Sequence, residues 1–124
     1  MRKVWKNYPL PFHNNAGPAA EAAMAADAQG KFWEMHDKLF ANQQQLDRPA
    51  LEKYAQELGL NMPKFKAAMD SSKFKERIQK DAALASTVGA SGTPAFFVNG
   101  HFISGAQPYD VFKTAIDQEL AKKK

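Results

Sequence analysis

The chain has 124 residues, with a hydrophobic fraction of 44% and a charged fraction of 24%, which are ordinary values for a globular protein of one domain. Its formal net charge of +4 comes mainly from basic residues near the two ends, without a basic helix face or an RNA-binding motif. Nucleic-acid binding is therefore not expected, and neither is a membrane segment, because no apolar run reaches about 18 residues.

Cysteine is absent from the sequence. This excludes disulfides within the chain, catalysis by a thiolate and metal sites with cysteine ligands. The N-terminus is basic but lacks the continuous apolar stretch of a signal peptide, so no export signal is expected in this sequence.

The first predicted element is a short strand over residues 2–8, RKVWKNY, which ends where Pro9 removes a backbone donor. A loop follows. Asn14 or Asn15 is then expected to cap a helix that starts near Pro18 and stops at a glycine.

Four further helices are predicted, because apolar residues recur every three or four positions up to the first glycine-rich turn. The first of them covers residues 31–46. The next two begin after the capping residues Asp47 and Asn61, and the last begins after Ser71 or Ser72.

The pattern then changes to that of a hairpin. Residues 95–98 form an unbroken apolar run, which predicts a strand covered on both faces. Asn99-Gly100 predicts a type I′ turn, and residues 101–104 return antiparallel. A final amphipathic helix opens at Pro108.

The three histidines, His13, His36 and His101, do not have the i, i+4 spacing of a helical zinc site. His36 shares a helix face with Phe32 and Phe40, so we expect it at the boundary of the core, satisfied by a hydrogen bond. No metal site and no cofactor are predicted.

Three aromatic residues, Phe32, Trp33 and Phe40, allow two interpretations. They form an aromatic ligand slot or they pack in the core, and packing against the sheet is the commoner reason for such spacing.

The Thr93-Pro94 bond is the most informative dipeptide, because proline does not normally begin a central strand. Cis bonds are about 5–6% of X-Pro bonds. On this base rate alone, a trans bond at the first residue of a strand is favoured.

Three segments resemble the DsbA-like thioredoxin-fold family, and in particular its bacterial branch with a compact helical insert. Residues 6–13 are similar to the second core strand and its loop, and residues 19–46, with KFWEMHDKLF, to the insert helices. Residues 89–117 resemble the cis-proline loop, the terminal hairpin and the last helix. The resemblance implies one α/β domain over residues 1–124, with a helical insert over about residues 17–88.

A strand and a helix with a Cys-x-x-Cys motif precede the strand matched by residues 2–8 in that family. The resemblance therefore implies a truncated thioredoxin-like fold without a catalytic residue. Thr93 and Pro94 alone match the family's active site. For the Thr93-Pro94 bond, the resemblance implies a cis peptide bond. It also implies a groove at these residues, in which backbone groups of Thr93 bind extended or unfolded polypeptide. It further implies a periplasmic location for the protein.

Two functions follow as expectations from the resemblance. The first is the C-terminal portion of a thiol-disulfide oxidoreductase, inactive by itself because it lacks cysteine, and the alternative is a non-catalytic peptide-binding or assembly module. Whether Met1 is an internal methionine or the start of a truly short product stays open.

The missing strand would leave two interior sheet edges unpaired, at about 1–3 kcal/mol for each buried unpaired group. We therefore expect residues 2–8 to pair with residues 95–98 directly, or to exchange with a second chain in a domain-swapped homodimer.

Overall fold

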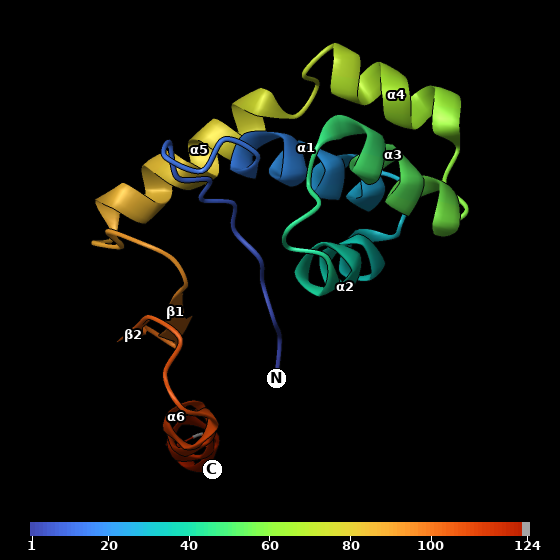
Figure 1. Cartoon of the computed structure of the whole chain (residues 1–124). Helices are drawn as coiled ribbons and strands as arrows, with labels where there is room; N and C mark the ends of the chain where they lie inside the picture. Colours follow the sequence, from blue (N-terminus) through green and yellow to red (C-terminus); the bar gives the residue numbers. More distant parts are fainter. Residues whose placement is uncertain (123–124) are drawn as a thin grey trace. The chain divides into compact units, whose positions relative to one another are not determined.

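A computed structural model describes residues 1–122, and the chain packs as two compact units (Figure 1). The first unit is Met1–Ala83 and the second begins at Leu84. The elements in chain order are α1 (Ala16–Asp27), α2 (Phe32–Ala41), α3 (Arg48–Glu57), α4 (Met62–Asp70), α5 (Lys75–Thr87), β1 (Ala95–Val98), β2 (His101–Ser104) and α6 (Tyr109–Lys122).

Side-chain caps start two of the helices. The side chain of Asp47 accepts a hydrogen bond of 3.4 Å from the backbone N–H of Ala50, and that of Asn61 accepts one of 3.1 Å from Lys64. Both predicted caps are confirmed. Each side chain supplies a hydrogen-bond acceptor to a backbone N–H of the first turn, which has no helical carbonyl to bind. Asn15 occupies the cap position of α1 without a side-chain hydrogen bond among the described residues.

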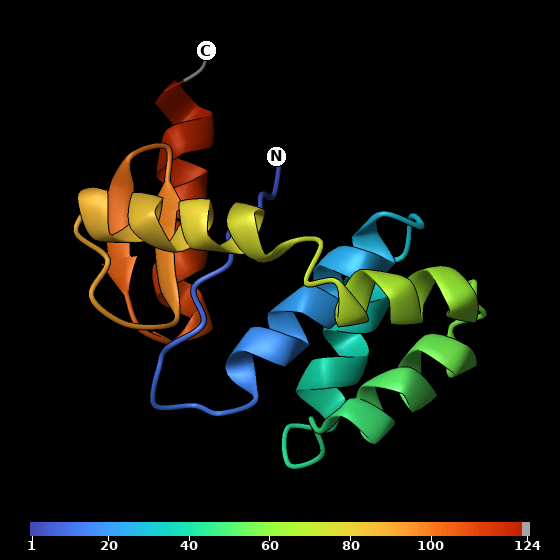
Figure 2. The same cartoon turned by 90° about the horizontal axis from the view of Figure 1, so that it is seen from above.

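The core of the first unit is helical. α1 packs against α2, α3 and α4 (Figure 2), and its run of buried small side chains lets these neighbours approach closely. Met35, Leu51 and Phe65 are the largest fully buried side chains. Burial of each large side chain contributes about 1.5–3 kcal/mol, so this unit has a packed core of its own.

The strand predicted for residues 2–8 is wrong. This stretch is extended but forms no strand, and Figure 1 shows it as plain coil before α1. The sheet of the described residues consists of β1 and β2, and the pairing of residues 2–8 with residues 95–98 stays a prediction. The backbone N–H of Asn7 is instead donated to the carboxylate of Asp81, at 3.1 Å.

Two helix limits differ from the prediction. The helix expected over residues 31–46 ends at Ala41, where the side chain of Asn42 donates a hydrogen bond of 2.8 Å to the carbonyl of Lys38. Such side-chain bonds compete with the helical ladder. α5 begins three residues after Ser72, whose positive φ of 51° interrupts the helical path.

The second unit contains the hairpin and α6. β1 and β2 are antiparallel, with Val98 opposite His101. Asn99 and Gly100 have φ values of 48° and 92°, so the predicted turn with two positive φ angles is confirmed. No helix among residues 1–122 is long and apolar enough to cross a membrane.

The expectation that residues 95–98 are covered on both faces is wrong. Phe96 lies against Phe112 of α6, with ring centroids 4.7 Å apart, and Phe97 pairs with Phe102 across the hairpin, at 5.1 Å. Phe96 and Phe97 nevertheless remain 39% and 46% exposed. One helix and a two-stranded sheet bury too little of a run in which both faces are apolar.

Candidate functional site

The loop at Thr93 and Pro94 leads directly into β1. The peptide bond between the two residues is cis, and the carbonyl of Pro94 accepts a hydrogen bond of 2.9 Å from the backbone N–H of Gly105. This bond closes the open end of the hairpin. Thr93 and Pro94 are both exposed, so a partner molecule can reach them.

An unpaired strand edge continues from this loop. In the described sheet β1 pairs with β2 alone, along the register from Ala95 opposite Ser104 to Val98 opposite His101. The backbone groups on the other edge of β1 therefore have no strand partner in this sheet. Such an edge accepts an extended polypeptide as an added strand.

An ionic group joins the turn of the hairpin to α6. The Nε2 atom of His101 lies 2.9 Å from Oε1 of Glu119, and Nζ of Lys122 lies 3.2 Å from the same oxygen. The hydrogen bond from Lys122 is the largest cause that lowers the pKa of Glu119 from its usual 4.5, against partial desolvation, and Asn99 and His101 act in the same direction as Lys122. The carboxylate therefore stays ionised well below neutral pH.

The chemistry of this loop is hydrogen bonding by the backbone. The sequence contains no cysteine, and the described residues contain no group of three histidine, aspartate or glutamate side chains arranged to hold a metal ion. Thr93 offers backbone groups and Pro94 offers a rigid apolar ring. The arrangement suits the binding of a polypeptide backbone.

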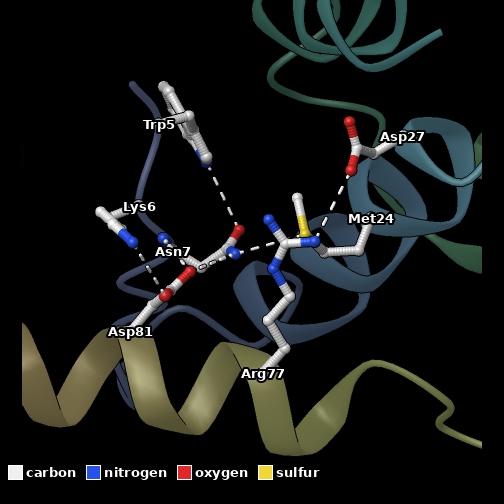
Figure 3. Close-up of polar contacts among 7 residues, drawn as sticks. All are labelled: Trp5, Lys6, Asn7, Met24, Asp27, Arg77 and Asp81. Atoms are coloured by element: carbon white, nitrogen blue, oxygen red, sulfur yellow. Dashed lines mark hydrogen bonds and ion pairs between the residues drawn. The ribbon is translucent and has the colours of Figure 1, made fainter. Parts of the chain in front are cut away.

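A buried polar cluster in the first unit was not predicted from the sequence (Figure 3). Oδ2 of Asp81 accepts hydrogen bonds from the backbone N–H of Asn7, at 3.1 Å, and from its Nδ2, at 2.8 Å. Asn7 is 3% exposed and Asp81 is 9% exposed, while Nζ of Lys6 lies 4.0 Å from Oδ1 of Asp81. The cluster fixes the N-terminal segment to α5.

The sequence pattern does not predict this cluster, because Asn7 and Asp81 are 74 positions apart. An asparagine within a short predicted strand and an aspartate in an amphipathic helix are each expected to be exposed to solvent. Their pairing is a property of the tertiary structure alone.

Five rings gather beside this cluster, from Trp5 and from α2. The aromatic surface, as we call it, consists of Trp5, Phe32, Trp33, His36 and Phe40. Core packing, the favoured interpretation of the α2 aromatics, holds for Phe32, which is 8% exposed. It is wrong for Trp33 and Phe40, which are 37% and 57% exposed.

His36 lies where the sequence predicted it. Its side chain is 23% exposed, at the boundary of the core, and Nδ1 lies 3.0 Å from Oδ1 of Asp37. The ring also contacts Trp5, with centroids 5.1 Å apart, and Phe40, at 4.7 Å. A hydrogen-bonded boundary histidine is therefore confirmed.

A cavity of about 250 Å³ lies between the loop before α1 and the start of α5. Its lining residues are Pro9, Gly17, Glu21, Ser72, Lys75, Ile78 and Gln79. Oε1 of Glu21 is buried and has no hydrogen-bond partner among the described residues. The cavity is separate from the aromatic surface, with which it shares no residue.

Sequence comparison supplies a family and several relatives. The model of the DSBA-like thioredoxin domain matches residues 3–117. A Salinispora tropica protein named Na(+)/H(+) antiporter NhaA 3 is 43% identical over 112 residues, which are 90% of this chain and 17% of that protein. Na(+)/H(+) antiporter NhaA of Herminiimonas arsenicoxydans is 43% identical over 97 residues, 78% of this chain and 16% of that protein. The chain thus spans less than a fifth of these relatives.

Solved structures give the same fold. A thioredoxin-like oxidoreductase from Silicibacter pomeroyi DSS-3 superposes with a TM-score of 0.83 and 27% identity, covering 98% of this chain and 68% of that one. The thiol-disulfide exchange protein alpha-DsbA2 from Wolbachia pipientis has a TM-score of 0.83 and 18% identity, over 94% of this chain and 64% of that one. The fold is thioredoxin-like, of mixed α/β class.

Proposed function

Because the chain belongs to the family of DSBA-like thioredoxin domains, we propose that it is the C-terminal portion of a DsbA-like thiol-disulfide oxidoreductase and is redox-inactive by itself. Disulfide exchange begins with the attack of a thiolate on a disulfide sulfur, and this chain has no cysteine to form one. The family's Cys-x-x-Cys motif then belongs to a segment outside these 124 residues.

The observation that carries the proposal is the unequal coverage of the two superposed structures. The thioredoxin-like oxidoreductase of Silicibacter pomeroyi matches 98% of this chain, but the chain matches only 68% of that protein. About a third of the oxidoreductase therefore has no counterpart here. We propose that the missing part holds the strand and the Cys-x-x-Cys helix that the family resemblance implies.

The apolar faces of the second unit support the same proposal. Large side chains of the hairpin and α6 are 39–51% exposed, namely Phe96, Phe97, Phe102, Val111 and Leu120. α6 has no buried residue among those described. Large apolar side chains that are this exposed normally contact another element, and an additional strand and helix of the same fold would cover them.

In the complete domain, Thr93 and Pro94 would contact the substrate, an extended or unfolded polypeptide. Both residues are exposed and stand at the start of the free edge of β1, which supports backbone pairing with such a chain. The NhaA-named relatives support a longer protein, because a domain with this sequence occupies only part of each of them. We place the domain in the periplasm, where disulfide exchange of this kind operates.

An insulin-reduction assay with dithiothreitol tests the proposal. The 124-residue chain should give the rate of a blank without protein. The same chain extended at its N-terminus by a family strand and Cys-x-x-Cys helix should reduce insulin, and a matched extension with Ser-x-x-Ser should not. Turnover by the unextended chain above the blank would refute the assignment of the chemistry to a missing segment.

A peptide-binding or assembly module without catalysis is the second candidate. The exposed Thr93 and Pro94 beside the free edge of β1 favour it, because this arrangement binds backbone without needing a thiol. Saturable binding of an extended peptide, weakened by Pro94→Ala, would support it, since alanine releases the φ angle that proline fixes. Pro108→Ala is the matched control, and equal weakening by both changes would count against a site at Pro94.

A further inference from the structure

We propose that the cavity of about 250 Å³ between the loop before α1 and the start of α5 binds a small zwitterion, of the class of the free α-amino acids. Its ammonium group would bind Glu21 and its carboxylate would bind Lys75. The lining residues all belong to the first unit, and none of them belongs to the Thr93-Pro94 loop. The inference therefore goes beyond the proposed function and does not depend on it. Figure 1 shows the N-terminus at the far end of the N-terminal segment, away from the start of α5.

Glu21 brings to the cavity a carboxylate without a partner. Its Oε1 atom is buried and unbonded, and among the described residues no hydrogen bond or ion pair involves the rest of the carboxylate. A polar group that leaves water without gaining a new partner lowers the stability of the fold. A glutamate carboxylate also rotates readily about its last torsion, so a donor in the cavity can bind it without breaking any bond within the protein.

Lys75 brings the opposite charge to the same cavity. It is the first residue of α5, it is exposed, and it forms no ion pair within the described part of the chain. The positive end of the helix dipole lies at this turn and adds to the field of the ammonium group. Glu76 of the same turn lies 3.5 Å from Nζ of Lys80 and does not line the cavity. An anionic group such as a carboxylate is therefore favoured on this side.

The two charges call for a ligand that binds both of them. Glu21 and Lys75 line one cavity, but they form no ion pair with each other in the described structure. A ligand with a cation alone would meet Lys75 as a like charge, and a ligand with an anion alone would leave Glu21 without a donor. A molecule that carries both charges satisfies both groups at once, and such charge complementarity selects the ligand.

The size and the remaining lining of the cavity limit the ligand to a small molecule with an apolar part. The volume of about 250 Å³ is below the roughly 300–1,000 Å³ of pockets for drug-sized ligands, and far above the roughly 10–15 Å³ that one water needs. Pro9 and Ile78 supply apolar surface, and Ser72 and Gln79 supply further polar groups. An amino acid with an aliphatic side chain fits this lining.

Gly17 leaves open space at the wall of the cavity. A Cβ atom added to this residue would meet no atom within 4 Å, so a larger side chain can enter without a clash at its base. Leucine is also a better helix former than glycine, and Gly17 lies inside α1. Gly17→Leu should therefore fill the site and abolish binding while α1 is kept.

Titration of the isotope-labelled whole chain with three related compounds tests the proposal. The probes are L-leucine, which has both charges, isocaproate, which lacks the ammonium group, and isoamylamine, which lacks the carboxylate. Amide signals of Gly17, Ser72 and Gln79 are followed in NMR spectra. L-Leucine should shift these signals to saturation. Each of the other compounds should bind at least about tenfold more weakly, because each lacks one hydrogen bond between charged groups.

Matched variants locate the contact. Glu21→Gln and Lys75→Met remove one charge each while keeping the approximate size of the side chain, and each should weaken L-leucine binding at least about tenfold. Glu76→Gln and Lys80→Met remove the same charges from an ion pair outside the cavity and should leave binding unchanged. Circular dichroism checks that each variant keeps its helix content.

Urea unfolding gives a second measurement that does not depend on the NMR signals. Glu21→Met should raise the midpoint of the free chain, because it replaces a buried acceptor without a partner by an apolar side chain of similar length. L-Leucine should raise the midpoint of the parent chain but not that of Glu21→Met. A lower midpoint for Glu21→Met without ligand would mean that the carboxylate stabilises the free chain, against the role proposed for it.

Three further results would overturn the proposal. Absence of saturable shifts with L-leucine would mean that the cavity holds water only. Binding of isoamylamine as tight as that of L-leucine would remove the role of Lys75. Undiminished binding of L-leucine by Gly17→Leu, or by Glu21→Gln, would place the contact outside this cavity. The insulin assay is independent of all these results.

Discussion

At the scale of single residues, a buried carboxylate sets the path of the N-terminal segment. Oδ2 of Asp81 accepts hydrogen bonds from the backbone N–H and from Nδ2 of Asn7, and both residues are almost completely buried. The backbone donor that a sheet neighbour would have used is thereby satisfied by a side chain. This hydrogen bond takes up one backbone donor of residues 2–8, the stretch that is extended without forming a strand.

Replacement of Asp81 should therefore destabilise the first unit. Asp81→Ala leaves the buried backbone N–H of Asn7 without its acceptor and leaves Nδ2 with only Sδ of Met24, at 3.5 Å, so we expect the free energy of unfolding to fall by about 1–3 kcal/mol. Urea unfolding followed by circular dichroism measures it. Asp117→Ala, in an exposed pair 2.7 Å from Lys113, is the matched control and should change stability by less than about 1 kcal/mol.

A double-mutant cycle with Asn7→Ala separates this pair from other effects. If the two side chains act together, the double variant should lose less stability than the sum of the single ones. Strictly additive losses, or an Asp81→Ala variant as stable as the parent chain, would contradict the assigned role.

At the scale of elements, the local signals gave reliable predictions. Asp47 and Asn61 cap their helices because the capping acceptor lies within three residues of its donor. Asn99 and Gly100 form their turn because its backbone angles depend on those two residues. The coverage of β1 and the strand at residues 2–8 depend on distant neighbours, and both predictions were wrong.

The contact between the hairpin and α6 should depend on pH. Hydrogen bonding from Lys122 lowers the pKa of Glu119 in the folded chain below its usual 4.5. The carboxylate therefore stabilises the fold fully above that value, and this stabilisation is lost as the pH falls through the lower folded pKa. Stability should drop as the pH falls below the usual 4.5 and through the lower folded pKa of Glu119, and part of the drop should vanish in Glu119→Gln.

Thermal unfolding at a series of pH values measures this effect. Lys122→Ala removes the main cause of the lowered pKa of Glu119. It should therefore reduce the loss of stability at acidic pH, as Glu119→Gln should. If stability fell at acidic pH as steeply in both variants as in the parent chain, the Glu119 carboxylate would not couple proton binding to folding.

At the scale of the whole molecule, the two units differ in how completely they bury their apolar residues. The first has a helical core around Met35, Leu51 and Phe65, whereas Phe97 and Leu120 of the second are about half exposed. The sequence, through its family resemblance, predicts Thr93 and Pro94 as site residues, and that assignment stays a prediction. It did not reveal the aromatic surface, because the ring of Trp5 meets α2 only in the folded unit.

The isolated chain should associate with itself. The edge of β1 is unpaired in the described sheet and its phenylalanines are exposed, so we propose a homodimer formed through this edge. Light scattering on a sizing column should give about twice the chain mass of 13.8 kDa at micromolar concentration. Phe97→Lys should favour the monomer, whereas Phe12→Lys, in a loop, should not.

A stable monomer of the parent chain at that concentration would contradict the homodimer. An equal effect of the Phe97 and Phe12 changes would move the contact away from β1.

The intact mass of the native protein, isolated from its cells, tests the central claim most directly. A DsbA-like domain completed by a strand and a Cys-x-x-Cys helix requires a mass well above 13.8 kDa, and peptide mapping should recover two cysteines N-terminal to the Met1 position. A native mass of 13.8 kDa would contradict the account, and the chain would then act without thiol chemistry.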